Sequence, residues 1–108
     1  MDPTFVAVNF ITCKPDYRER FEELFRTRAH AIDRIPGFID MQVLQPDDDS
    51  EYLIVSRWAR KEDFEKWTGS PEFLEGHKRG FEDIADAKRT GKESPMTSTF
   101  RTYAVLAS

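Results

Sequence analysis

Residues 64–81 read FEKWTGSPEFLEGHKRGF, two helical patterns separated by a break. Phe64 and Trp67 are three residues apart, so they share one face of the first helix. Ser70 is a candidate N-cap of the second helix, and the proline after it occupies the first helical position, where proline is favoured. One apolar stripe then runs along the second helix, formed by Phe73, His77, Phe81 and Ile84. The role of a histidine on this stripe is the question that the sequence raises.

The strands and helices around this stretch are predicted from apolar periodicity and turn residues. Residues 4–13 form a β-branched, aromatic strand that is apolar on both faces, and residues 15–34 form a helix. Arg28 follows the inner stripe of that helix, whereas His30 is predicted to face solvent. The remaining segments are predicted as a hairpin of strands 38–45 and 52–58, a flexible connection over 86–95, and a last strand over 96–106.

The predicted order is strand, helix, strand, strand, helix, strand, in one domain over residues 1–108. This is the ferredoxin-like α+β plan, an antiparallel sheet with helices on one face. The other face would carry Val6, Val8 and Phe10 of the first strand, which are too apolar to remain in water. We therefore expect a homodimer that packs sheet against sheet, a dimeric α/β barrel.

Composition excludes several functional classes. The 108 residues carry a net charge of -4 without a basic run, so binding of nucleic acid through a positive face is not expected. The sequence contains no apolar stretch of the roughly 20 residues that span a bilayer, and Met1-Asp2-Pro3 does not resemble a signal peptide. Cys13 is the lone cysteine, is expected to be structural, and fits a reducing compartment. A cytoplasmic protein without membrane or nucleic-acid partners is predicted.

Three polar or amphipathic residues are expected to meet in an apolar space. Asn9 interrupts the face of the first strand that looks toward the helices, and those helices carry Trp67 and His77. Each of the three is also compatible with an ordinary core position, and periodicity leaves the two interpretations of His77 about equally balanced. Gly76 and Gly80 cost helix propensity, which a flat ligand close to this helix or close helix–sheet packing would explain. Together, Asn9, Trp67 and His77 match an apolar ligand pocket with few polar groups.

Metal chemistry is restricted by the same residues. No Cys, His, Asp and Glu cluster has the spacing of a zinc site, so a metal held only by protein is not expected. A haem iron needs only one axial histidine, because the porphyrin supplies four nitrogens. Lys78 and Arg79, beside His77, and the basic residues of 88–92 are more typical of a solvated face than of contacts to haem propionates.

Four motifs resemble a known family. They are VAVNF at 6–10, IPGF at 35–38, SRW at 56–58 and DFEKWTGSPEFLEGHK at 63–78. The first three are similar to the antibiotic-biosynthesis-monooxygenase superfamily, and the last resembles its haem-degrading branch, the IsdG-type monooxygenases. The likeness spans roughly residues 4–105. The active triad of that branch, a strand Asn, a helix Trp and a helix His, falls on Asn9, Trp67 and His77.

The resemblance implies a homodimer that binds one haem b per subunit, as both substrate and cofactor, between sheet and helices. His77 is then the axial ligand of the haem iron, and Asn9 donates a hydrogen bond to dioxygen at the iron. Trp67 presses on the porphyrin and ruffles it. The implied reaction opens the porphyrin to a linear tetrapyrrole and releases iron. A separate reductase is implied as the external electron donor, since the sequence contains no flavin or nicotinamide fingerprint.

Two other functions remain open at this point. Other members of the superfamily are cofactor-free monooxygenases of quinols or polyphenols, in which His77 or Asn9 would assist proton removal or stabilise a dienolate. Alternatively, the same pocket could belong to a carrier of haem or another small ligand that catalyses nothing. These alternatives differ in whether haemin binds and whether bound haem is consumed.

Overall fold

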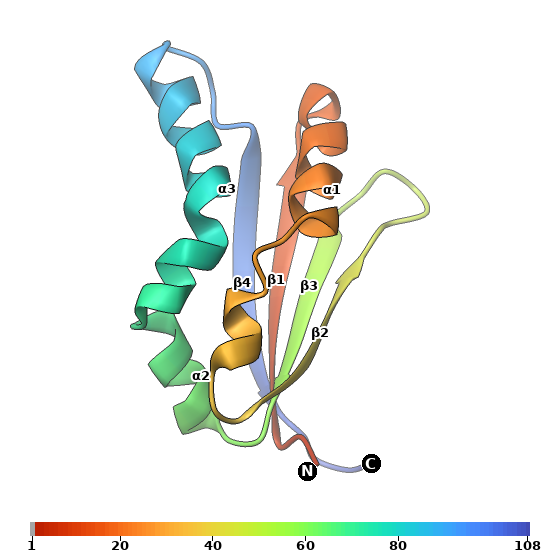
Figure 1. The fold of residues 1–108 in the computed structure, drawn as a ribbon. Helices are drawn as coiled ribbons and strands as arrows, with labels where there is room; N and C mark the ends of the chain where they lie inside the picture. The colour runs from red at the N-terminus through yellow and green to blue at the C-terminus, as the bar shows by residue number, and fades with distance from the viewer. Residues whose placement is uncertain (1) are drawn as a thin grey trace.

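Strand β1 (Phe5–Cys13) lies inside a four-stranded antiparallel sheet in this computed structural model, which describes residues 2–108. It pairs with β3 (Tyr52–Trp58) on one side and with β4 (Met96–Ala104) on the other. β2 (Phe38–Leu44) pairs with β3, so the sheet has the order β2-β3-β1-β4 (Figure 1). With the helices between the strands, this is the predicted ferredoxin-like α+β fold.

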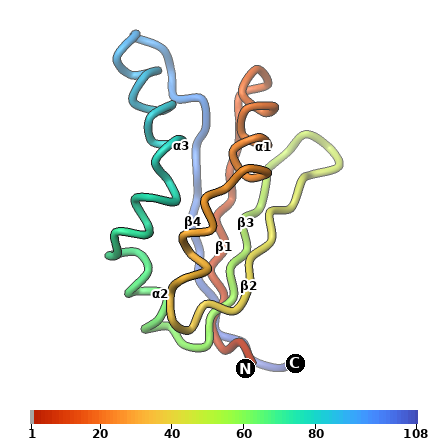
Figure 2. The backbone as a smooth tube through the Cα atoms, in the orientation of Figure 1, coloured from red at the N-terminus to blue at the C-terminus, as the bar shows by residue number. Residues whose placement is uncertain are grey.

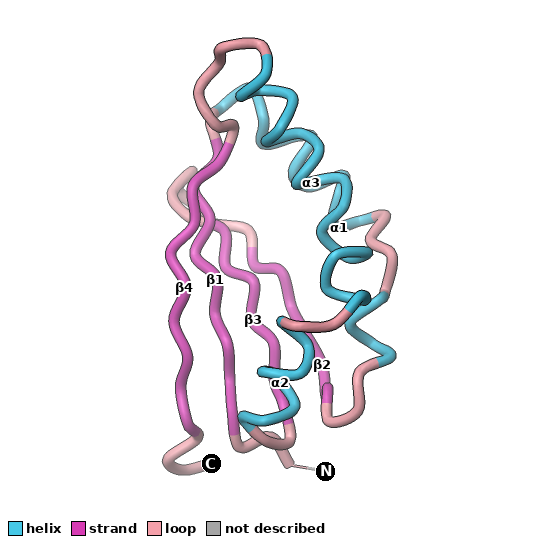
Figure 3. Tube along the Cα trace, turned by 90° about the vertical axis from the view of Figure 1, so that its left-hand side faces the viewer, coloured by secondary structure: helices cyan, strands magenta, loops and turns pink. Residues whose placement is uncertain are grey.

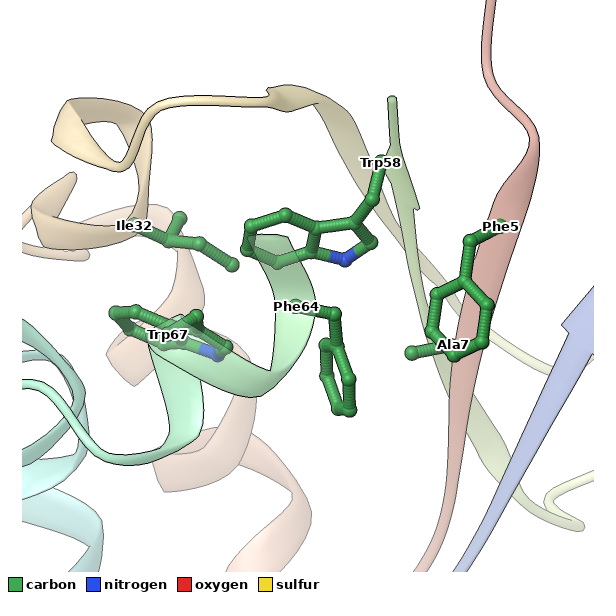
Figure 4. Packing of buried hydrophobic residues seen from close by; sticks show 6 residues of the cluster. All are labelled: Phe5, Ala7, Ile32, Trp58, Phe64 and Trp67. Atoms are coloured by element: carbon green, nitrogen blue, oxygen red, sulfur yellow. The ribbon is translucent and has the colours of Figure 1, made fainter. Parts of the chain in front are cut away.

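The helices cover one face of the sheet, as predicted (Figure 3). On β1, alternate residues point to that face. Phe5 and Ala7 pack there in a buried cluster with residues from β3 and from the helical segments, namely Ile32, Trp58, Phe64 and Trp67 (Figure 4). A second buried cluster lies farther along β1 and consists of Ile11, Cys13, Phe21 and Tyr52. These two apolar clusters hold the helices on the sheet, because burying each large side chain stabilises the fold by about 1.5–3 kcal/mol.

The prediction of one helix over 15–34 is wrong in its middle. The structure has a 3-10 turn at Pro15–Tyr17, α1 at Arg18–Arg26, and a second 3-10 helix at Ala31–Arg34. Arg79 donates hydrogen bonds to the carbonyl oxygens of Leu24 and Thr27, which satisfies orphan groups at the end of α1.

Residues 27–30 redirect the chain after α1. His30 adopts the left-handed conformation with φ 59°, which a continuous helix does not allow. After this bend Ala31 and Ile32 become buried, Ile32 against the cluster around Trp58. Tertiary burial therefore overrides the helical pattern of the sequence at this point.

The hairpin of β2 and β3 is confirmed, with Asp47–Asp49 in its turn. Gly37, just before β2, has φ 89°, a conformation that residues with a Cβ rarely adopt. A Cβ at this position would also collide with the carboxylate of Asp63, which is buried near the start of the next helix. Gly37 is thus required both by its dihedral angle and by close packing.

The two helices expected from residues 64–81 are confirmed as α2 (Lys61–Thr68) and α3 (Pro71–Arg89). The side chain of Ser70 accepts a hydrogen bond from the backbone N–H of Phe73, so Ser70 is the predicted N-cap. Residues 86–89 were predicted as part of a flexible connection, and that prediction is wrong. α3 continues through them to Arg89, with Thr90 as its C-cap, before Gly91 with its φ of 75°.

The other face of the sheet carries none of the helices among residues 2–108 (Figure 3). Phe10 of β1 pairs with Leu53 of β3, which in turn pairs with Leu44 of β2, so three apolar side chains cross this face in a row. Leu44 is 43% exposed. Figure 2 shows both chain ends at the same end of the sheet, where the N–H of Val105 donates to the carbonyl of Thr4 over 2.9 Å.

Candidate functional site

A cavity of about 340 Å³ lies between the helix-covered face of the sheet and the helices. Its volume is in the range of small-molecule sites, roughly 300–1,000 Å³. Its walls are mostly apolar. They are formed by the inward-facing residues of all four strands, by α2 and α3, and by the segment after α1. The apolar lining includes Ala7, Ile32, Met41, Ile54, Phe64 and Phe100. The fold therefore places an apolar cavity where the sequence predicted an apolar pocket.

Asn9 lies on the floor of the cavity, in the middle of β1. Its backbone neighbours across the sheet are Ile54 on β3 and Phe100 on β4, both of which also line the cavity. The side-chain oxygen Oδ1 is buried and has no hydrogen-bond partner within residues 2–108. An unpaired buried amide oxygen costs about 1–3 kcal/mol, so Asn9 carries a free-energy cost that an apolar residue at this position would avoid.

Trp67 forms part of the wall from α2 and is buried. Figure 4 shows its indole beside Ile32, with Phe64 of the same helix nearby. Its ring packs edge-on against Phe73 of α3, with centroids 5.2 Å apart. A Cβ at Gly76 would stand 3.4 Å from Cη2 of Trp67, an ordinary van der Waals distance, so packing against the indole does not by itself require a glycine.

His77 is half-buried on the α3 wall of the same cavity. Its Nδ1 lies 2.7 Å from the carbonyl oxygen of Phe73. A carbonyl can only accept, so Nδ1 carries the proton, and in the neutral ring Nε2 keeps its lone pair. The imidazole also packs against the rings of Phe73 and Phe81, at centroid distances of 4.1 and 5.2 Å. This arrangement fixes both the tautomer and the ring plane, as in many metal-ligating histidines.

The structure thus brings Asn9, Trp67 and His77 together on one cavity, although they are up to 68 positions apart in the sequence. The Trp67 and His77 rings are themselves 6.0 Å apart between centroids. No group of three or more His, Cys, Asp and Glu side chains in the described part of the chain is arranged to hold a metal ion. Metal chemistry at this site would therefore require a prosthetic group that leaves one position for a histidine.

Two basic side chains at the cavity were not identified from the sequence as site residues. Arg28 and His30 both line it, and both bond to Asp33, with Arg28 Nη1 and His30 Nδ1 each 3.1 Å from a carboxylate oxygen. Desolvation opposes ionisation of Asp33, but these hydrogen bonds outweigh it and lower the pKa of its carboxyl group. The position of Arg28 on an apolar stripe was the available signal. His30 is exposed, as predicted, yet the bend after α1 brings it to the cavity.

Arg79 is close to His77 in the sequence, but its guanidinium hydrogen-bonds the end of α1.

Cys13 is buried in the second apolar cluster, and burial raises the pKa of its thiol to about 11. A thiol with so high a pKa is a poor nucleophile, in agreement with its predicted structural role.

Residues 4–79 match the family described as antibiotic biosynthesis monooxygenase. The chain belongs to this family. Among its relatives is the heme oxygenase (mycobilin-producing) of Mycobacterium tuberculosis, which is 31% identical over 100 residues that cover 81% of this chain and 95% of that protein. The heme oxygenase (staphylobilin-producing) of Staphylococcus epidermidis is 38% identical over 77 residues, which cover 68% of this chain and 73% of that protein.

Two solved structures are similar over nearly the whole chain. MhuD of M. tuberculosis, a heme-degrader solved with two hemes in its active site, matches with a TM-score of 0.68 and 25% identity over 96% of this chain and 97% of MhuD. SnoaB of Streptomyces nogalater, a cofactor-independent oxygenase, matches with a TM-score of 0.70 and 23% identity over 99% of this chain and 97% of SnoaB. The likeness to SnoaB shows the shared fold alone.

None of the helices within residues 2–108 is both long and apolar enough to cross a membrane.

Proposed function

We propose that this protein is a haem-degrading monooxygenase that binds haem, oxidatively opens the porphyrin and releases iron. The observation that carries the proposal is the orientation of His77, whose Nδ1–H is bonded to the Phe73 carbonyl while its ring lines an apolar cavity. The names of the two relatives, both heme oxygenases, support the same function.

Haem fits the residues that line the cavity. A neutral imidazole with a free Nε2 lone pair is the usual axial ligand of haem iron, and we assign this role to His77. The apolar walls suit the porphyrin ring, and the side-chain amide of Asn9 on the cavity floor can donate to a polar group of the ligand. Bound haem would supply the iron that binds dioxygen and the ring that is oxidised.

Asn9 and Trp67 act on the bound ligand in different ways. Asn9 donates a hydrogen bond from its amide, a group that stays neutral at any physiological pH. Trp67 is a rigid body that packs against Ile32 and Phe73, so it resists displacement when a flat ligand enters. We assign to it the distortion of the porphyrin plane that favours ring oxidation.

Arg28 is the proposed contact for a ligand carboxylate. Arg28 lines the cavity, and its guanidinium is held by Asp33 through Nη1, which leaves other N–H groups of the fork as donors. Charge-assisted hydrogen bonds of this kind are about twice as strong as neutral ones. A haem propionate at the cavity opening would meet this group.

The proposal extends to assembly and electron supply. The row of Phe10, Leu53 and Leu44 on the open sheet face favours a homodimer through that face, the dimeric α/β barrel. Light scattering tests for this homodimer, and the mass of a single chain in solution would contradict it.

Because ring opening consumes electrons, a separate reductase is the proposed electron donor. The cytoplasmic location and the single domain over residues 1–108 stay predictions.

Titration of purified protein with haemin tests the function. We expect an absorption band of bound haem that saturates at one haem per chain. An electron donor and oxygen are then added, and loss of the haem spectrum with release of iron is expected. Absence of the band would instead favour the cofactor-free monooxygenase, and a haem spectrum that survives reductant and oxygen would identify a carrier.

A further inference from the structure

Arg79 is a half-buried residue of α3 that does not line the cavity, yet its side chain bonds to the end of α1. Its Nη2 donates to the carbonyl oxygens of Leu24 and Thr27 over 3.1 and 2.8 Å. Its Nη1 donates to the hydroxyl oxygen of Thr27 over 2.9 Å. One planar guanidinium therefore binds three acceptors at once, a geometry that the ammonium group of a lysine does not offer.

The acceptors of Arg79 lie directly before a wall of the cavity. Thr27 is the C-cap of α1, and the next residues, 28–32, all line the cavity and are here called the cavity segment. Residues 27–30 belong to no helix or strand, so the start of the cavity segment lacks a regular ladder of backbone hydrogen bonds. Such stretches open locally at a low free-energy cost unless other contacts hold them.

Two other contacts hold parts of the cavity segment. Ala31 and Ile32 are buried, which fixes the end of the segment away from α1. The guanidinium of Arg28 bonds to Asp33 over 3.1 Å, but Asp33 follows directly in the same stretch of chain, so this bond does not fix Arg28 relative to α3. The start of the segment, where Arg28 lies, is fixed to α3 through Arg79.

We propose that Arg79 is a positioning residue for Arg28, and that it sets where Arg28 stands relative to His77. Arg79 follows His77 closely on the same helix, so one rigid element carries the axial ligand and holds the segment of the carboxylate contact. A porphyrin keeps its iron and the attachment points of its propionates at fixed separations, and binding groups must be held within about 0.5 Å of the productive geometry. The inference rests on the proposed function, in which His77 binds the iron and Arg28 a propionate.

Titration of Arg79→Met with haemin and with its dimethyl ester tests this role. Methionine keeps the apolar stem of the side chain but none of its donors. We expect Arg79→Met to bind haemin roughly fivefold more weakly than the wild type does, and to bind the ester with unchanged affinity. In the double variant Arg28→Ala/Arg79→Met the second substitution should add no further loss, because residues that act through one another are not additive.

Arg34→Met is the matched control. Arg34 joins the stretch after the cavity segment to α3 through an ion pair with Glu75, but both side chains are about half exposed, and such pairs contribute little. Arg34→Met should therefore keep the wild-type preference for haemin over the ester. A merely structural role of Arg79 predicts equal losses with both ligands or additive losses in the double variant, and either result overturns the inference. An equal loss of preference in Arg34→Met overturns it as well.

Amide hydrogen exchange of the haem-free protein tests the contact without any ligand. The backbone N–H groups of Thr27 and Arg28 bond to carbonyl oxygens of α1, and both should exchange faster in Arg79→Met while the amides of β1 and β3 keep their wild-type rates. Arg79→Gln removes the same guanidinium with a shorter polar side chain and should give the same result, so the test does not depend on one variant folding. Unchanged exchange at Thr27 and Arg28 overturns the inference. Failure of the wild type to bind haemin would instead refute the proposed function, and the exchange rates would still decide whether Arg79 holds the cavity segment.

Discussion

The Nδ1 atom of His77 lies 2.7 Å from the carbonyl oxygen of Phe73, one turn earlier in α3. The bond is local to the helix, so α3 itself selects the imidazole tautomer before any ligand arrives. Stacking against Phe81 restrains the ring further. A histidine ring that is restrained in this way would lose little side-chain entropy on binding iron.

Replacing His77 by Ala should abolish the saturable haem absorption band. Removing a second-shell partner of a metal ligand already costs 10–100-fold in affinity, so loss of the ligand itself should cost at least about 100-fold. Absorption titration with haemin measures this. Glu82→Ala is the matched control, since Glu82 is exposed on the same helix and does not line the cavity. Equal titration curves for the two variants would contradict axial ligation by His77.

Trp67→Phe should slow haem bleaching more than it weakens haem binding. Phenylalanine keeps an apolar ring but not the reach of the indole, and Trp67→Ala is unsuitable because such truncations cost about 3–5 kcal/mol of stability. We expect the single-turnover bleaching rate to fall at least about tenfold, which is 1.4 kcal/mol of barrier, with nearly unchanged affinity. A variant that bleaches at the wild-type rate but binds haem poorly would remove the proposed role in distortion.

Arg28→Ala should weaken haemin binding by about tenfold or more, since a hydrogen bond to a charged group contributes about 1.5–3 kcal/mol. The matched ligand is the dimethyl ester of haemin, which lacks free carboxylates. If Arg28 binds a propionate, the wild type and Arg28→Ala should bind the ester with equal affinity, and the difference seen with haemin should shrink as salt increases. An equal loss with both ligands would point to a structural effect of the variant.

Gly37→Ala should lower the free energy of unfolding by about 1–3 kcal/mol, the usual cost of a strained backbone conformation. Gly37 has φ 89°, and the new Cβ would meet the Asp63 carboxylate. Gly69→Ala is the control, because Gly69 has φ -100° and open space around it. Urea denaturation measures both. Equal midpoints for the two variants would refute the close packing of Gly37 on α2.

Asp83→Asn should destabilise the protein at neutral pH and reduce its sensitivity to acid. Desolvation opposes ionisation of Asp83, but hydrogen bonds from Arg20 and Tyr17 outweigh it and hold the pKa of the carboxyl group below its usual range. A carboxyl group with a lowered folded-state pKa stabilises the fold above its unfolded pKa of about 3.9, and this contribution is lost as pH falls through the folded value. We expect a loss of about 1–2 kcal/mol at pH 7.

Urea denaturation between pH 7 and pH 2 tests this assignment. The stability difference between wild type and Asp83→Asn should be constant above about pH 5 and should disappear in acid. Glu19→Gln is the control, since Glu19 is exposed on α1. A difference that persists at pH 2 would show that packing of Asp83, and not its charge, stabilises the contact between α1 and α3.

The sequence predicted the features that depend on local patterns. The spacing of Phe73, His77 and Phe81 was sufficient to place His77 on the inner face of α3, and Ser70 marked the start of that helix. Alternation on β1 placed Asn9 on the face toward the helices. These positions follow from the 3.6-residue and two-residue periods, which act on near neighbours in the chain.

Tertiary structure alone decided where the helical pattern of 15–34 is interrupted and which side chains complete the cavity. The bend at His30 exists because burial of Ile32 beside Trp58, and the bonds from Arg79 to the end of α1, stabilise it more than a continued helix would. That bend brings His30 to the cavity. The pairing of Asn9 with Ile54 at the cavity floor likewise depends on strand register, which partners more than 40 residues apart determine. Long-range contacts of this kind leave no local signal in the sequence.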